Sequence, residues 1–139
     1  MNDRSRYECS FDADASTSRS TVIAWLDRQP KTSIWTTAVT VLEVRFGLQI
    51  LPASKRRATL MQGFELLLEK IGHRIAPFDV EAAEHASDLM AFRHKKGQPV
   101  ELRDTMIAGI VIARHAVLAT RNVTYFQEVG IGVVNPWKT

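Results

Sequence analysis

Short β-rich segments alternate with longer amphipathic segments from residue 22 to the end of this chain. The long segments carry apolar stripes at helical spacing, and the short ones have the composition of strands. Strands that are connected through helices pair in parallel and are covered on both faces. We therefore predict an α/β fold in which a mostly parallel sheet lies between two layers of helices.

Capping and turn residues set the expected boundaries. Thr40 and Asp79 are placed to cap two helices, and Gly72 and Gly97 are placed where two helices end. We expect helices over 22–28, 40–51, 53–71, 79–96 and 99–114, a short helical turn near 125–128, and strands over 33–37, 74–78, 117–120 and 131–135.

The first 20 residues differ in composition from the rest of the 139-residue chain. They contain few apolar residues, which predicts a disordered or non-native leader over residues 1–20, ahead of one domain over 21–139. A single cysteine, Cys9, fits a reducing cytoplasm. No apolar run reaches the roughly 18 residues of a membrane helix, so no membrane contact is expected. The net charge of +3 permits nucleic-acid binding without demanding it.

Asp104 is an acid on the apolar stripe of an expected helix, where it shares a face with Ile107, Ala108 and Val111. Burying a lone carboxylate is costly, so such a group is hydrogen-bonded, paired with a cation or bound to a metal. A structural role is equally open. The helix macrodipole favours an acid in the first turn by about 0.3–1 kcal/mol, and Arg103, Arg114 or Arg121 could pair with it.

Glu43 is a second acid near a helix start, on a face shared with Phe46, Gly47 and Ile50. The pattern Thr40-x-x-Glu43 is typical of a capping box, in which the glutamate bonds back to the cap residue. A role in a site is the alternative, because Gly47 leaves room for a ligand or another backbone.

The two acids together favour a site for a hard divalent cation. Two neighbouring carboxylates repel unless a proton or a cation lies between them. Mg²⁺ and Mn²⁺ prefer oxygen ligands and need only a few protein carboxylates. The four histidines are scattered and there is no cysteine pair, so nothing in the sequence supports zinc. The strand over 117–120 also ends in polar residues, and ligands of open α/β sheets gather at such edges.

Six segments, in order, resemble PIN-domain toxins of the VapC type, close to their FitB-like branch: residues 22–30, 37–47, 74–79, 102–108, 118–122 and 135–137. The resemblance implies a three-layer α/β/α PIN-like sandwich. It also implies a Mg²⁺- or Mn²⁺-dependent ribonuclease, an endonuclease toxin of a type II toxin–antitoxin pair. A VapB-like antitoxin, an RNA substrate and a homodimer are the implied partners.

The resemblance also assigns roles to particular residues. Glu43 and Asp104 match the family's acids and would hold the metal and carry catalysis, with Asn122 as a weak or water-mediated ligand. Tyr125 stands where many members have a further aspartate. The residues expected to contact RNA or the metal's water shell are Thr120, Arg121 and Arg45.

The front of the chain departs from the family, which opens with an apolar strand running into Asp-Thr-Asn. This chain has no such motif, so we expect the first strand to be missing or replaced and cleavage to be weak or absent. Asp12 and Asp14 are the nearest acids. Two alternatives stay open: a catalytically dead PIN-like module that binds antitoxin or RNA, and a plain α/β interaction domain in which Glu43 caps and Asp104 pairs with arginine.

An apolar groove for the antitoxin is the last expectation. Leu48, Leu51, Leu60 and Phe64 are the candidates to line it, although helical stripes of this kind commonly belong to the core.

Overall fold

The computed structural model describes residues 24–30 and 33–136, together with the backbone of residues 7–9. Within this part of the chain, five strands form one sheet in the order β3-β2-β1-β4-β5, and every pairing is parallel. The predicted parallel sheet is therefore confirmed. The strands are β1 (Tyr7–Cys9), β2 (Ile34–Thr37), β3 (Ile75–Ala76), β4 (Val117–Ala119) and β5 (Val133–Val134).

Strand β1 lies at the centre of the sheet, between β2 and β4. Tyr7 is in register with Ile34 on one side and with Val117 on the other. We expected the first strand to be missing or replaced, and a strand with the sequence Tyr-Glu-Cys occupies its place. The expectation of disorder is thus wrong for these three residues, because backbone pairing on both sides can hold a central strand whose side chains give no strand signal. The rest of the expected leader lies outside the described residues.

Among the described residues, five helices connect and cover these strands, and a helical turn over residues 24–27 precedes β2. The N-cap side chains of Thr37, Ser54 and Asp79 each accept a bond from a backbone N–H in the first turn of their helix. Gly72 and Gly97 follow two helix ends with φ of 67° and 68°, as a glycine just beyond a helix end favours. The helices are α2 (Ala38–Gln49), α3 (Lys55–Lys70), α4 (Val80–Lys95), α5 (Leu102–Ala113) and α6 (Val123–Glu128).

The start of α2 differs from the predicted one. Thr37 is the N-cap and accepts a hydrogen bond of 2.9 Å from the N–H of Thr40, while the two hydroxyl oxygens lie 2.8 Å apart. Thr40 is therefore the third residue of the helix, and Glu43 lies in the second turn, too far along to bond back to the cap. The capping-box interpretation of Glu43 was wrong, because the N-cap residue is Thr37, at the end of β2, and not Thr40.

The two faces of the sheet bury two separate apolar clusters. Ile34 on β2 and Ala119 on β4 belong to the cluster formed with α2, α3 and the turn over 24–27. Trp35 and Leu118, their neighbours along the same strands, belong with α4, α5 and α6 on the other face. This alternation follows from the two-residue period of a strand.

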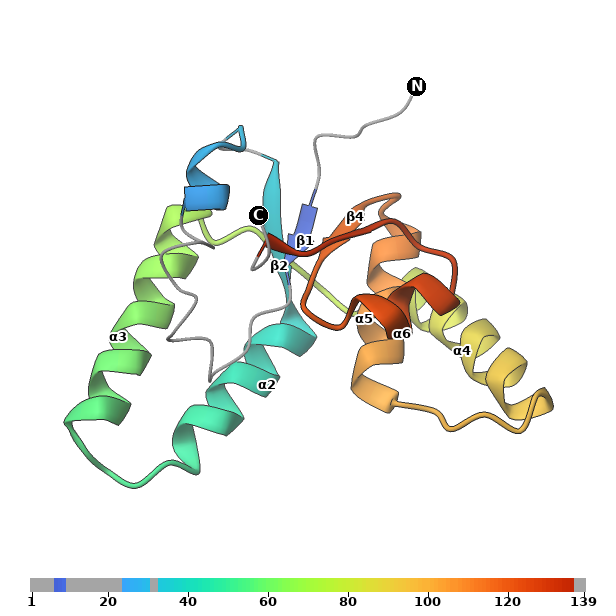
Figure 1. Cartoon of the computed structure of the whole chain (residues 1–139), viewed down its shortest axis with the longest axis horizontal. Helices are drawn as coiled ribbons and strands as arrows, with labels where there is room; N and C mark the ends of the chain where they lie inside the picture. Colours follow the sequence, from blue (N-terminus) through green and yellow to red (C-terminus); the bar gives the residue numbers. More distant parts are fainter. Residues whose placement is uncertain (1–6, 10–23, 31–32, 137–139) are drawn as a thin grey trace.

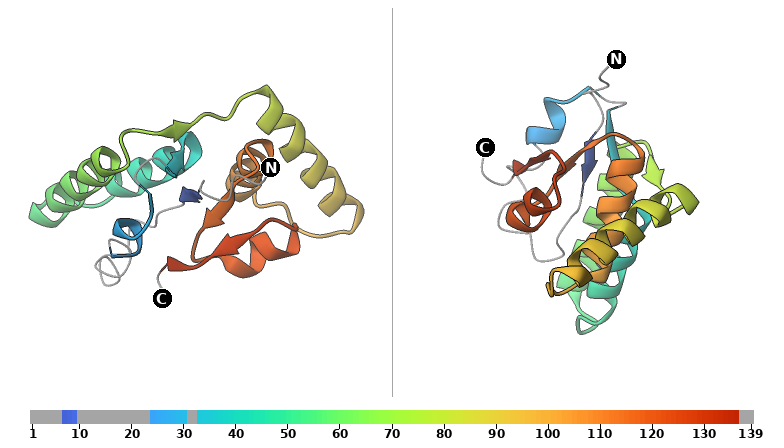
Figure 2. Two further views of the ribbon diagram at one scale, coloured as in Figure 1. Left: turned by 90° about the horizontal axis from the view of Figure 1, so that it is seen from above. Right: turned by 90° about the vertical axis from the view of Figure 1, so that its right-hand side faces the viewer.

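Helices therefore flank the sheet on both sides, with α2 and α3 on one and α4, α5 and α6 on the other (Figures 1 and 2). The expected three-layer α/β/α arrangement is confirmed. No helix of the described residues is long and apolar enough to cross a membrane.

Helices α4 and α5 pack most closely at Gly109. A Cβ atom built on Gly109 would lie 2.4 Å from the backbone oxygen of Ala82 and 3.0 Å from the Cβ of Ala86. The backbone of α4 cannot yield as a flexible side chain would, so the contact requires glycine. This close approach fixes how α5 lies on the sheet, and so where its first turn points.

We predict that Gly109→Ala lowers the free energy of unfolding by about 1–3 kcal/mol, the usual range for overpacking, despite the better helix propensity of alanine. Urea denaturation measures the change. Gly132→Ala is the matched control, because its new Cβ would meet Val117 at an ordinary contact distance of 3.7 Å. Equal stability of the Gly109→Ala and Gly132→Ala proteins would contradict the close helix contact.

Candidate functional site

Polar side chains from three elements meet at the edge where the strands end. Strand β2 runs directly into α2, which carries Glu43, and β4 is followed by Thr120 and Asn122. Because α5 precedes β4 and runs back against it, the first turn of α5, with Asp104, lies at the end of β4. The parallel topology thus brings together residues that are far apart in the sequence, at the edge where α/β sheets bind their ligands.

Glu43 reaches from α2 toward the first turn of α5. Its Oε2 lies 3.5 Å from Nε of Arg103, and its side chain is 27% exposed. The expectation that Arg103 could pair with Asp104 is therefore only partly met, because the close ion pair of Arg103 is with Glu43. This ion pair connects α2 to α5 at the edge where the strands end.

Asp104 is held by Asn122, which donates a hydrogen bond of 3.1 Å from Nδ2 to Oδ2 of the carboxylate. Asn122 is the N-cap residue of α6, yet its side chain makes no capping bond to that helix. An asparagine at this position normally satisfies an N–H of its own helix. Here that interaction is given up for a contact with a carboxylate, and departures from local rules of this kind concentrate at functional sites.

The pKa values of both carboxyl groups are raised. For Glu43, burial is the main cause of the raised pKa. The charge of Arg103 partly offsets this increase, and the charge of Asp104 adds to it. Burial also dominates for Asp104, followed by the bond from Asn122, which lowers its pKa, and the charge of Glu101, which raises it. The two groups are thus close enough for one charge to disfavour the other, and partial desolvation disfavours both. A proton or a cation would relieve this cost.

The donor set fits a hard divalent cation. The candidate ligands are oxygen atoms, from the carboxylates of Glu43 and Asp104 and the amide of Asn122, and such cations accept water at the remaining positions. Among the described residues, no cluster of three or more His, Cys, Asp or Glu side chains is arranged to hold a metal. The acids expected nearest the front, Asp12 and Asp14, lie outside the described residues.

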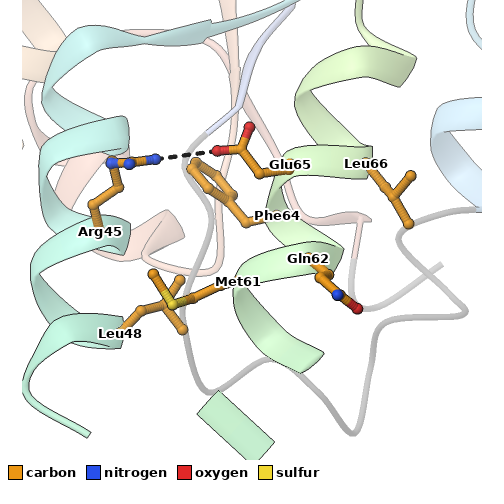
Figure 3. A pocket seen from close by; sticks show the side chains of 7 residues that line it. All are labelled: Arg45, Leu48, Met61, Gln62, Phe64, Glu65 and Leu66. Carbon is orange, nitrogen blue, oxygen red and sulfur yellow. Dashed lines mark hydrogen bonds and ion pairs between the residues drawn. The ribbon is translucent and has the colours of Figure 1, made fainter. Parts of the chain in front are cut away.

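The residues expected to contact RNA fall into two groups. Thr120 is buried, and its Oγ1 accepts a bond of 3.1 Å from the N–H of Asn122, so it shapes the turn that presents that amide. Arg121 is exposed in the same turn. Arg45, by contrast, points toward α3 and pairs with Glu65 at 3.1 Å (Figure 3). The structure does not bring Arg45 to the carboxylates, because it lies two residues from Glu43 and so on another face of α2.

A second layer of contacts lies behind Asp104 and was not predicted from the sequence. The hydroxyl oxygen of Thr105 lies 2.7 Å from the phenolic oxygen of Tyr125. The guanidinium of Arg93 lies over the ring of Tyr125, 4.8 Å from its centre. Arg93 is itself buried, with only 6% of its surface exposed. Only Thr105, directly after Asp104 on a buried face, could have suggested this layer.

A groove of about 500 Å³ lies between α2 and α3 (Figure 3). Of the four apolar residues expected to line an antitoxin groove, Leu48 and Phe64 line it while also being buried in the core. Leu51 and Leu60 pack against that core. The groove lining is completed by Arg45, Met61, Gln62, Glu65 and Leu66.

Comparison with known proteins matches most of the chain. The family model of the PIN domain matches residues 12–131. The VapC ribonuclease Y4jK of Sinorhizobium fredii (strain NBRC 101917 / NGR234) is 36% identical over 118 residues, which cover 84% of each chain. Toxin FitB of Neisseria gonorrhoeae (strain ATCC 700825 / FA 1090) is 29% identical over 117 residues, again 84% of each. The crystal structure of FitAcB from Neisseria gonorrhoeae is 25% identical, with a TM-score of 0.80, and the match covers 96% of this chain and 99% of that chain.

We predict that Glu43→Gln stabilises the metal-free protein near pH 7. A carboxyl whose pKa is raised in the folded state binds its proton more tightly there than in the unfolded state. Its ionisation therefore lowers the free energy of unfolding as the pH rises from the ordinary pKa through the raised one. The difference in melting temperature should therefore shrink toward pH 4, near the ordinary values of 4.5 and 3.8 for the two acids. Thermal unfolding in EDTA at both pH values measures it, with Glu84→Gln, exposed on α4, as the control. A Glu43→Gln protein that is less stable than wild type at pH 7 would contradict the unfavourable burial.

Proposed function

The chain belongs to the PIN domain family, and from this premise we propose that it is a divalent-metal-dependent endoribonuclease, the toxin of a type II toxin–antitoxin pair. The observation that carries the proposal is the meeting of Glu43 and Asp104 at the sheet edge, with the pKa of each raised by burial. The relatives named VapC ribonuclease and tRNA(fMet)-specific endonuclease VapC support the reaction class. An RNA substrate and an intracellular antitoxin would place its work in the cytoplasm.

The proposed reaction is hydrolysis of a phosphodiester bond in RNA. A Mg²⁺ or Mn²⁺ ion, when bound, supplies an activated water and stabilises negative charge on the phosphate. Glu43 and Asp104 would hold that ion, and Asn122 keeps the Asp104 carboxylate in place through its bond of 3.1 Å. Alternatively, Glu43 would leave the ion to Asp104 and accept a proton from the attacking water, a role that its raised pKa suits. Arg121, exposed beside Asn122, would bind an RNA phosphate.

We propose that this site, with two acids, binds the cation more weakly than a site with three acids would. The part of the chain that the structure describes contributes two carboxylates to the site, and Tyr125 occupies the first turn of α6 as a neutral side chain. Fewer charged ligands mean weaker binding of the cation, so a higher metal concentration is needed for cleavage.

The second candidate function is a PIN-like module that binds RNA or antitoxin without cutting. The same two-carboxylate donor set favours it, because a cation bound too weakly at physiological concentration would leave a folded but inactive site. Restoration of cleavage at millimolar Mn²⁺ separates the two, since a dead module would bind RNA but leave it intact at any concentration.

We propose that the cognate antitoxin occupies the groove between α2 and α3. Solved structures similar to this chain are complexes named FitAB and VapBC, and the groove offers an apolar floor for a partner segment. Leu66 at the rim is 64% exposed, while Arg45 and Glu65 provide a charged border. An apolar floor with a polar rim is the arrangement that a bound helix or strand requires. The homodimer stays a prediction, which sedimentation velocity tests.

We predict that Asp104→Asn lowers the rate of RNA cleavage about 100- to 1,000-fold, the range for losing one group that stabilises developing charge. Glu43→Gln should have a similar effect, and EDTA should abolish cleavage by the wild type. Gel assays on total RNA with a titration of Mn²⁺ measure it. Asp88→Asn, which removes an exposed acid on α4, should cleave normally. Chelator-resistant cleavage, or full activity of Asp104→Asn, would remove the proposed site.

The same assay decides whether the acids that follow β1 replace the missing family aspartate. We expect the double variant Asp12→Asn/Asp14→Asn to retain wild-type cleavage, because neither acid belongs to an Asp-Thr-Asn motif. A loss as large as that of Asp104→Asn would show that one of them completes the site.

We predict that Leu66→Asp weakens the complex with the cognate antitoxin at least tenfold, by roughly 1.4 kcal/mol or more, because the bound antitoxin segment would cover a charge at the rim of the apolar floor. Co-expression from the native operon, followed by calorimetry on the purified partners, measures the affinity. Val80→Asp is the matched control, since Val80 is 75% exposed on α4, away from the groove. Equal affinities of the two variants would place the antitoxin elsewhere.

A further inference from the structure

A hydrogen bond behind the carboxylate pair joins the first turns of α5 and α6. The hydroxyl oxygen of Thr105 lies 2.7 Å from the phenolic oxygen of Tyr125 and 2.7 Å from the backbone oxygen of Glu101. Thr105 is completely buried. Tyr125 is half-buried, so water competes for this bond less than for an exposed one.

The direction of this bond follows from counting protons. A carbonyl oxygen can only accept, so Thr105 donates its single hydroxyl proton to Glu101. The phenol of Tyr125 must then donate to the Thr105 oxygen. Removing the phenolic oxygen would leave that buried acceptor without its donor, while every other atom of the ring could stay in place.

The ring of Tyr125 is itself held in position. The guanidinium of Arg93 lies over its face, and Nε of Arg93 donates a bond of 2.9 Å to the backbone oxygen of Pro99. The ring of Phe126, which is buried, meets that of Tyr125 edge to face, with centres 5.1 Å apart. Contacts from α4 and α6 thus fix the position of the ring that carries the phenolic oxygen.

Two hydrogen bonds connect the start of α5 to the start of α6. Asp104 and Thr105 are neighbours on α5, and their partners Asn122 and Tyr125 are about one turn apart on α6. The Asn122–Asp104 bond is exposed, so water competes for both groups. The part-buried bond between Tyr125 and Thr105 is less open to this competition and holds the two turns in the register that the exposed bond needs.

We propose that Tyr125 is a positioning residue, which places the Asn122 amide against Asp104 by donating its hydrogen bond to Thr105. It touches neither substrate nor cation and acts through Asn122 alone. The consequence for cation binding rests on the proposed function, whereas the consequence for the Asn122 amide does not.

The variant Tyr125→Phe keeps the ring and its contact with Arg93 and removes only the donor. We expect the side-chain amide signals of Asn122, assigned by their loss in Asn122→Ala, to move toward solvent-exposed values in NMR spectra. We also expect the dissociation constant for Mn²⁺, measured by electron paramagnetic resonance, to rise about tenfold, as for other groups that orient a metal ligand. Ser87→Ala, which removes a hydroxyl bonded locally within α4, should change neither.

A second variant covers the case in which Tyr125→Phe does not fold. Thr105→Val removes the acceptor of the same bond and should shift the Asn122 signals in the same way. In the double variant the shift should be no larger than in either single one, because both remove one interaction. Additive shifts would overturn the proposal.

Unchanged Asn122 signals in a folded Tyr125→Phe protein would also overturn it, whatever happens to Mn²⁺. Moved signals together with an unchanged Mn²⁺ constant would overturn the link from Tyr125 to the cation. A wild type that binds no Mn²⁺ and cleaves no RNA would instead refute the proposed function, while the Asn122 signals would still decide the positioning role.

Discussion

Parallel pairing of the strands is the constraint from which the site follows. When all strands of a sheet point the same way, each helix that leads into a strand must begin at the edge where the strands end. Helix α5 leads into β4, so Asp104 in its first turn is brought to the edge from which β2 enters α2. Strand β1 completes this geometry by pairing with β2 and β4 at once. Strand β1 thus joins the half of the sheet that leads into α2 to the half that follows α5.

The carboxylate pair is unfavourable for folding, which is a reason to regard it as functional. The macrodipole of α5 would by itself lower the pKa of Asp104, yet burial outweighs this effect and the pKa is raised. A side chain selected for stability alone would not be placed where desolvation and a neighbouring acid both disfavour its charge. Active sites commonly retain such costs because removing them would remove the chemistry.

Local signals in the sequence were sufficient for the helices and the parallel sheet, and they singled out the two acids that the structure brings near each other. Asp79, Gly72 and Gly97 act as predicted, because caps depend on residues a few positions away. Two features were beyond such signals. Strand β1 is held by backbone pairing with strands distant in sequence, so its side chains carry no period that predicts it. The Arg93–Tyr125–Thr105 contacts join three helices, and no spacing within one helix can indicate them. Thr40 was misassigned because two threonines compete for one cap, and Thr37 at the end of β2 takes it.

The balance of charge at the site is opposite to that of the whole chain. The chain carries a net charge of +3, which favours the approach of polyanions over distances comparable to the Debye length. At the sheet edge, Arg103 pairs with Glu43, while Asp104 accepts a bond from the neutral amide of Asn122 and lies near enough to Glu101 for that charge to raise its pKa. The Arg103–Glu43 pair is half exposed on the arginine side, and such pairs contribute only about 0–1 kcal/mol. Arg103 therefore leaves negative charge uncompensated between α2 and α5. A small, strongly charged cation can neutralise that charge at much closer range than a guanidinium 3.5 Å from a single oxygen.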